Sequence, residues 1–204
     1  RDTDRSRGLG DVYKRQGLIV LLAVLGIIVL IGIILAIWIW VQYNAFIRLR
    51  NNVDESYSTM DVYMKKRYDL IPNLVETVKG YAKHEEATLE GVMQARYSCM
   101  NASTTAERAK SENMLSDTLK SLFAVTENYP QLQANQNFLD LQQTLKTLEE
   151  EISVSRKYYN GCVKTYNIKR ESFPTNMIAK WFKFEKKELF EIAEAEKVAP
   201  KVQF

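Results

Sequence analysis

Residues 17–41 read GLIVLLAVLGIIVLIGIILAIWIWV and contain no charged side chain. An α-helix rises about 1.5 Å per residue, so this run extends over roughly 37 Å and exceeds a bilayer hydrocarbon core of about 30 Å. Trp38, Trp40 and Tyr43 lie at its downstream end. Amphipathic aromatic rings favour the headgroup zone of a bilayer. The stretch therefore predicts a transmembrane anchor over residues 17–42.

Two other interpretations of this run are less consistent with its length. A buried core helix of a soluble protein rarely holds more than about 14 purely apolar residues. A cleaved signal peptide has an apolar region of about 7–15 residues, followed by a small-residue cleavage site. The sequence after Ile37 is Trp-Ile-Trp-Val-Gln-Tyr-Asn, which has no such site. An uncleaved anchor is favoured.

The first sixteen residues, RDTDRSRGLGDVYKRQ, differ in character from the rest of the chain. They show no apolar period and resemble translated cloning sequence, so we interpret residues 1–16 as a non-native leader. Arg48 and Arg50 follow the span. By the positive-inside rule they place the C-terminal domain in the cytoplasm, whereas the basic residues of a native leader would oppose that orientation.

Beyond the span, apolar side chains recur every three or four residues, which indicates helices with one buried face. The first stripe is Val53, Tyr57, Met60, Met64, Tyr68, Ile71, Val75, Val78 and Ala82. It keeps its phase across Pro72, which either kinks a continuing helix or opens a second one. The pattern extends through Leu89 toward Tyr97. After a turn at residues 101–105, a further helix runs to Pro130.

The clearest helix lies near the C-terminus. Its stripe is Phe138, Leu141, Leu145, Leu148, Ile152, Ser155, Tyr159, Cys162 and Tyr166. This repeat of seven residues favours antiparallel bundle or coiled-coil packing. Phe173-Pro174 ends the helix. We therefore predict an all-α protein, with an N-terminal transmembrane helix followed by an antiparallel up-and-down bundle of three to four long helices. The bundle occupies residues 43–172, and residues 173–204 form a short amphipathic helix, over 178–195, and a C-terminal tail.

The chain holds few side chains that carry catalysis. His84 is the single histidine, and Cys99 and Cys162 are the only cysteines. Two Glu-x-x-His pairs, a four-ligand zinc site or a triad with a usable histidine cannot be assembled from this set. No phosphate-binding glycine motif occurs, and Glu149–Glu151 fit a solvated helix face. We predict no catalytic residue, no metal, no cofactor and no disulfide. Basic and acidic residues, 28 and 25, are interspersed, which argues against nucleic acid as a partner.

A basic and aromatic stretch follows Pro174. Its lysines are Lys180, Lys183, Lys186 and Lys187, and they alternate with Trp181, Phe182, Phe184 and Phe190. Such a stretch suits the surface of an anionic membrane, so Lys180, Trp181, Lys183, Lys186 and Lys187 are candidate membrane-surface residues. The alternative is a further packed helix, with lysines that extend along its apolar face to water.

Several longer motifs go beyond helix periodicity. They are Tyr43-Asn44, RYDLIPNL at 67–74, ENYPQLQAN at 127–135 with Phe138, RKYYNGCVKTYN at 156–167, and FPTN at 173–176. Together these segments resemble the LemA family of bacterial membrane proteins over residues 17–204. The resemblance implies one transmembrane helix, a helical bundle on the cytoplasmic side of the inner membrane, and no established catalytic residues. Some relatives are associated with magnetosome membranes.

The polar members of these motifs lie close to the apolar stripes. They are Arg67, Asp69, Asn73, Glu127, Arg156, Asn160 and Asn167. In a bundle they can form one interhelical network that fixes helix register, or a ligand or partner site. Arg67 with Glu127 is the acid–base pair most worth testing in this network. Asn73 is expected to satisfy the carbonyl that Pro72 leaves free.

These observations support three functions, in decreasing order. The first is a membrane-tethered interaction or scaffold module without catalysis, whose partners are the lipid bilayer and either a second copy or another membrane protein. The second is a membrane-shaping or membrane-surface-binding protein that uses the 180–190 stretch. The third is a small-ligand binder or enzyme that uses the interhelical polar network, which would require a concave polar pocket.

Overall fold

The structure is a computed structural model that describes residues 3–190, with side chains described from residue 15 onward. Its elements are all helical: α1 (Thr3–Tyr81), α2 (Glu86–Asn101), α3 (Thr105–Thr126), α4 (Pro130–Gln133), α5 (Gln136–Glu171) and α6 (Thr175–Trp181). No strand occurs among the residues described. The predicted all-α class is confirmed.

Helix α1 joins the apolar span to the bundle without a break. Its part from residue 15 on contains the one stretch, among the residues described, that is long and apolar enough to cross a membrane. The side chains of residues 18–37 face outward, as lipid-facing side chains do. Pro72 lies inside α1, so the interpretation of a continuing helix is correct. The origin of residues 1–16 stays a prediction.

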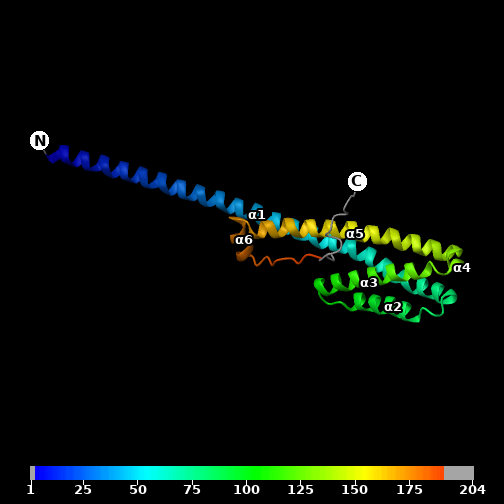
Figure 1. The fold of residues 1–204 in the computed structure, drawn as a ribbon. Helices are drawn as coiled ribbons and strands as arrows, with labels where there is room; N and C mark the ends of the chain where they lie inside the picture. The colour runs from blue at the N-terminus through cyan, green and yellow to red at the C-terminus, as the bar shows by residue number, and fades with distance from the viewer. Residues whose placement is uncertain (1–2, 191–204) are drawn as a thin grey trace, which may run out of the picture.

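The bundle is organised around the antiparallel pair of α1 and α5 (Figure 1). The α2–α3 hairpin covers the half of this pair that is remote from the span, and α6 with the chain after it covers the half near the span (Figure 1). One continuous core of apolar side chains runs through both halves, from Phe46 to Val78 on α1 and from Phe138 to Tyr166 on α5. The predicted up-and-down bundle is confirmed.

The turns between helices follow from local sequence. Thr104 accepts a hydrogen bond from the Glu107 amide, and the Glu107 carboxylate accepts one from the Thr104 amide, which completes a capping box for α3. Asn135 caps α5 by accepting from the Phe138 amide. Pro130 begins α4, where a missing N–H leaves no helical bond unmade. These caps separate α3, α4 and α5.

The prediction of a helix over residues 178–195 is correct as far as Trp181 and wrong for residues 182–190. Helix α6 ends at Trp181, residues 182–183 form a turn, and residues 184–190 have no regular secondary structure. The amide of Phe184 donates to the Ala179 carbonyl at 2.9 Å and that of Lys183 to Lys180 at 3.3 Å. Lys183 has φ 55°, so this is a Schellman helix end. The rest of that prediction, and the tail, lie outside the described residues.

The two cysteines are free and differ in their surroundings. Cys99 is fully buried, and burial raises the pKa of its thiol to about 11, whereas Cys162 is half-buried beside a surface cleft. We expect a maleimide at pH 7.5 to label one thiol per folded chain, at Cys162, because the Cys99 thiol stays protonated and shielded. Mass spectrometry of the labelled chain tests this, with two labels in denaturant as the control. Labelling of Cys99 in the folded chain would contradict the packing described.

Candidate functional site

A charged cluster lies inside the bundle, where α1, α3 and α5 meet. The Arg67 guanidinium is fully buried and donates to the carboxylates of Glu112 on α3 and Glu149 on α5. Tyr68 donates its hydroxyl to Glu112. Ser116 accepts from Arg67 at 3.1 Å and donates to Glu149 at 2.7 Å. One arginine therefore ties together three helices.

The protonation of Glu112 reflects two opposing effects. Burial raises the pKa of its carboxyl group, and the positive charges of Arg67 and Arg156 oppose that rise. A carboxylate without counter-charge is strongly disfavoured in such a place. The charged state of Glu112 therefore depends on Arg67 and Arg156.

The structure corrects the predicted pairing of Arg67 with Glu127. Glu127 is the C-cap of α3 and faces solvent, while Arg67 pairs with Glu112 and Glu149. Of the three glutamates predicted on a solvated face, Glu150 and Glu151 are exposed, whereas the Glu149 side chain is only 37% exposed and bonds Arg67 and Ser116. Asp69 and Asn73 lie on the exposed face of α1. Asp69, Asn73 and Glu127 thus lie outside the cluster, whereas the charge of Arg156 acts on Glu112 together with that of Arg67.

The carbonyl group that Pro72 leaves free is satisfied from a different helix than expected. Pro72 has no N–H for the Tyr68 carbonyl, one turn back. The Nε of Arg96, on α2, donates to that oxygen at 2.7 Å. Asn73 does not serve this purpose, and its own carbonyl accepts from Thr77. Arg96 therefore joins α2 to the proline site of α1.

Asn160 and Asn167, one heptad apart on α5, bind the main chain of the segment 184–190. Asn160 donates to the Phe190 carbonyl at 2.9 Å and accepts from the Phe190 amide at 2.8 Å. Asn167 makes the same pair of bonds with Lys187, at 2.8 and 3.1 Å. Each side-chain amide thus bonds both the N–H and the C=O of one residue, as the main chain of a neighbouring β-strand would.

Further side chains of α5 bond the same segment. Tyr159 and Tyr166 donate their hydroxyls to the carbonyls of Glu188 and Glu185, each at 2.9 Å, and Arg170 donates to that of Phe184. Burial raises the pKa of Tyr159 to about 12, so its hydroxyl remains a donor at neutral pH. We call this surface, Tyr159, Asn160, Tyr166, Asn167 and Arg170 with the facing side of α1, the groove.

Two phenylalanines of the segment fill apolar positions of the groove. Phe184 stacks on Phe46 of α1, with ring centroids 4.7 Å apart, and Phe190 is fully buried beneath the Arg156 guanidinium, 5.3 Å from its ring centre. Between them, Lys187 forms an ion pair with Asp54 at 2.9 Å. The groove thus binds the main chain of an extended segment and holds two aromatic side chains that are six residues apart. Arg156 also contacts Asn113 on α3, at 3.3 Å.

The candidate membrane-surface residues do not act as one group. Lys186 pairs with Glu171 at 3.1 Å, and Lys187 lies in the groove. Lys180, Trp181 and Lys183 are exposed at the end of the bundle near the span. The aromatic residues Phe184 and Phe190 are buried. The stretch is therefore split between an exposed part at α6 and a packed part in the groove.

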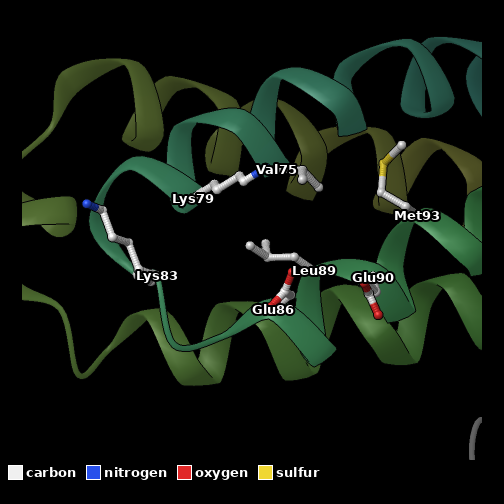
Figure 2. A pocket seen from close by; sticks show the side chains of 8 residues that line it. Val75, Lys79, Lys83, Glu86, Leu89, Glu90 and Met93 are labelled. Atoms are coloured by element: carbon white, nitrogen blue, oxygen red, sulfur yellow. The ribbon is translucent and has the colours of Figure 1, made fainter.

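Two surface clefts are distinct from the groove. One of about 290 Å³ lies between the end of α1 and the start of α2, with Leu89 reaching into it and Lys79, Lys83 and Glu86 around it (Figure 2). Another, of about 430 Å³, lies between α3 and α5 and borders Ser116 and Glu149. This second cleft is where a small ligand would bind under the ligand-binding hypothesis, but the Ser116 and Glu149 side chains at its edge already bond Arg67. No group of three or more metal-ligating side chains occurs within the residues described.

Sequence reasoning missed Glu112, Arg96 and the two tyrosines of the groove. A signal for Glu112 was present, because it continues the stripe of Leu115, Leu119 and Leu122 at the same three- and four-residue spacing. A charge at such a position predicts a buried counter-charge on a facing helix. Arg96 carried no comparable signal, since its partner is a main-chain oxygen.

Comparison with known proteins connects this architecture to a family. The LemA family profile matches residues 56–204, the part that holds the charged cluster and the α5 side of the groove. Magnetosome protein MamQ 2 of Paramagnetospirillum magneticum is 23% identical over 216 residues, covering 93% of this chain and 76% of its own length. Protein LemA of Metamycoplasma hominis is 24% identical over 176 residues, covering 86% and 80%. The chain belongs to the LemA family.

Proposed function

We propose that this protein is a single-pass interaction module of the bacterial cytoplasmic membrane, without catalytic activity, whose groove binds an extended segment of a second copy. The groove carries the proposal. It contacts main-chain atoms of residues 184–190, and it holds Phe184 and Phe190 in buried positions. Such contacts give affinity for an extended chain whichever molecule supplies it. Arg48 and Arg50, just after the span, support a cytoplasmic bundle.

A second copy is the occupant that the geometry favours. Copies anchored by the same span hold their grooves at the same height above the bilayer, so exchange needs lateral reach alone. Residues 183–190 extend over about 27 Å at roughly 3.4 Å per residue. A pair of packed helices is about 20 Å across. The far end of the segment therefore reaches an adjacent copy when the turn at Lys183 opens, as in domain swapping.

The test places one cysteine on each of two differently tagged copies, with Cys99 and Cys162 replaced by alanine. One copy carries Asp54→Cys, and the other carries Lys187→Cys. Their side chains face each other across the groove in one chain. Exchange predicts that a short thiol-specific cross-linker joins the two tags in native membranes. A chain that carries both cysteines supplies the reference product within one molecule.

The control addresses whether the groove is responsible. Asn160→Leu with Asn167→Leu in the Asp54→Cys copy is expected to remove the product between copies, while the exposed Gln143→Leu leaves it unchanged. Helix content of each variant is measured by circular dichroism. A product confined to the doubly substituted chain, or one indifferent to the two asparagines, contradicts the proposal. Capture of a different membrane protein by the Asp54→Cys copy would replace the second copy as partner.

A further inference from the structure

An apolar surface is exposed at the end of the bundle near the span. Phe173, Met177, Trp181 and Phe182 are 81%, 63%, 72% and 43% exposed, although they come from one short stretch of chain. Ile178 and Ala179, on the opposite side of α6, are buried against the core. We call these four exposed residues the α6 face. Exposed apolar side chains gathered in one place mark a contact with a partner or a membrane.

The α6 face lies at the depth where the span leaves the bilayer. Tyr43 directly follows the predicted span, and its ring centre is 4.9 Å from that of Phe182. The Trp181 ring centre is a further 5.7 Å from Phe182. Trp38 and Ile39 of the span already pack against the core of the bundle. Since Trp38, Trp40 and Tyr43 mark the headgroup zone, the α6 face meets the same zone.

The charges around the α6 face suit an anionic leaflet. Lys180 and Lys183 are exposed beside Trp181, and Arg48 is exposed on α1. The nearby acid Glu171 is paired with Lys186. Basic residues near a bilayer surface are attracted by anionic headgroups at about 1 kcal/mol each. The anchor keeps the face at the surface, so a few side chains are enough to hold it there.

We propose that the α6 face is a second membrane contact, in which Trp181 and its apolar neighbours insert among anionic headgroups next to the span. The bundle is then attached to the bilayer at two points instead of one. This contact differs from the predicted insertion of the whole 180–190 stretch, because Phe184 and Phe190 are held inside the groove. It is independent of any exchange between copies.

The experiment uses tryptophan fluorescence of the full chain in vesicles of phosphatidylcholine and phosphatidylglycerol. Trp38→Phe and Trp40→Phe leave Trp181 as the single tryptophan. Lipids brominated near the headgroup end of the acyl chain are expected to quench most of its emission, and its maximum is expected at shorter wavelength than that of an exposed tryptophan. Lipids brominated near the chain end are expected to quench less.

A matched variant adds Trp181→Phe and Tyr158→Trp, which moves the reporter to a similarly exposed site on α5, beyond the α6 face. Its emission is expected to be insensitive to brominated lipid. Equal insensitivity of Trp181 would overturn the proposal. Lys180→Glu with Lys183→Glu is expected to weaken the quenching of Trp181. Unchanged quenching in that variant would contradict the role of anionic headgroups.

Discussion

Replacing Arg67 with methionine is expected to lower the free energy of unfolding of the bundle by about 3–5 kcal/mol. Methionine is shorter than arginine and carries no charge, so the fully buried Glu112 loses its ion pair with Arg67, and the charge of Arg156 alone opposes the cost of its burial. Denaturant unfolding of the detergent-solubilised chain, followed by circular dichroism, measures the change. The exposed Lys65→Met, on the same helix, is the control and is expected to change stability by less than about 1 kcal/mol.

Two further measurements distinguish a lost ion pair from a local packing defect. Adding Glu112→Leu to Arg67→Met removes the unpaired charge, so the double variant is expected to regain much of the loss. The loss is also expected to shrink as the pH falls. Without Arg67 the folded-state pKa of Glu112 rises further above its unfolded-state value. The charged carboxylate therefore destabilises the fold at high pH, and this loss is relieved as the pH falls through the folded-state pKa. A loss that is independent of pH would contradict this account.

Replacing Arg96 with methionine is expected to lower the free energy of unfolding by about 1.5–3 kcal/mol. The Tyr68 carbonyl receives no helical hydrogen bond at Pro72 and accepts from the Arg96 guanidinium instead. Its loss leaves a main-chain oxygen inside the bundle without a donor. The same unfolding experiment measures the effect, with Gln94→Met, an exposed residue of α2, as the control.

The proline itself supplies the decisive second variant. Pro72→Ala restores an N–H that can donate to the Tyr68 carbonyl, so Arg96→Met is expected to be nearly neutral in that background. The two sites then show a coupling energy in a double-mutant cycle. Equal losses with proline and with alanine at position 72 would show that Arg96 acts through some other contact.

The fold was predictable because each long helix repeats a simple pattern. Val53, Met60, Met64 and Ile71 share one face by spacing alone, and the structure buries all four. The span needed only its length and lack of charge. The Arg67 cluster was half predictable, since its arginine continues the stripe of α1 and was singled out. Its partner was misassigned, because spacing places a residue on a face but does not give the height at which two helices meet.

The groove was not predictable from local pattern. Asn160 and Asn167 were selected as motif residues, yet their partners are main-chain atoms of a segment whose composition resembles an amphipathic helix. Lys183 adopts a left-handed conformation that glycine usually supplies, and no glycine indicates the turn there. The competition between continuing α6 and packing Phe184 against Phe46 is decided by tertiary contacts. Apolar spacing describes one element at a time, so it contains no information about contacts between elements.

Because α1 is continuous, the direction in which the groove faces is coupled to the rotation of the span about its own axis. Each residue of an α-helix turns by about 100° and rises about 1.5 Å. One residue inserted within the span therefore swings the whole bundle through more than a quarter circle, whereas seven residues restore its heading to within about 20°. A second transmembrane helix that packs against the span would fix its rotation, and would thereby set the direction in which the groove faces outside the bilayer.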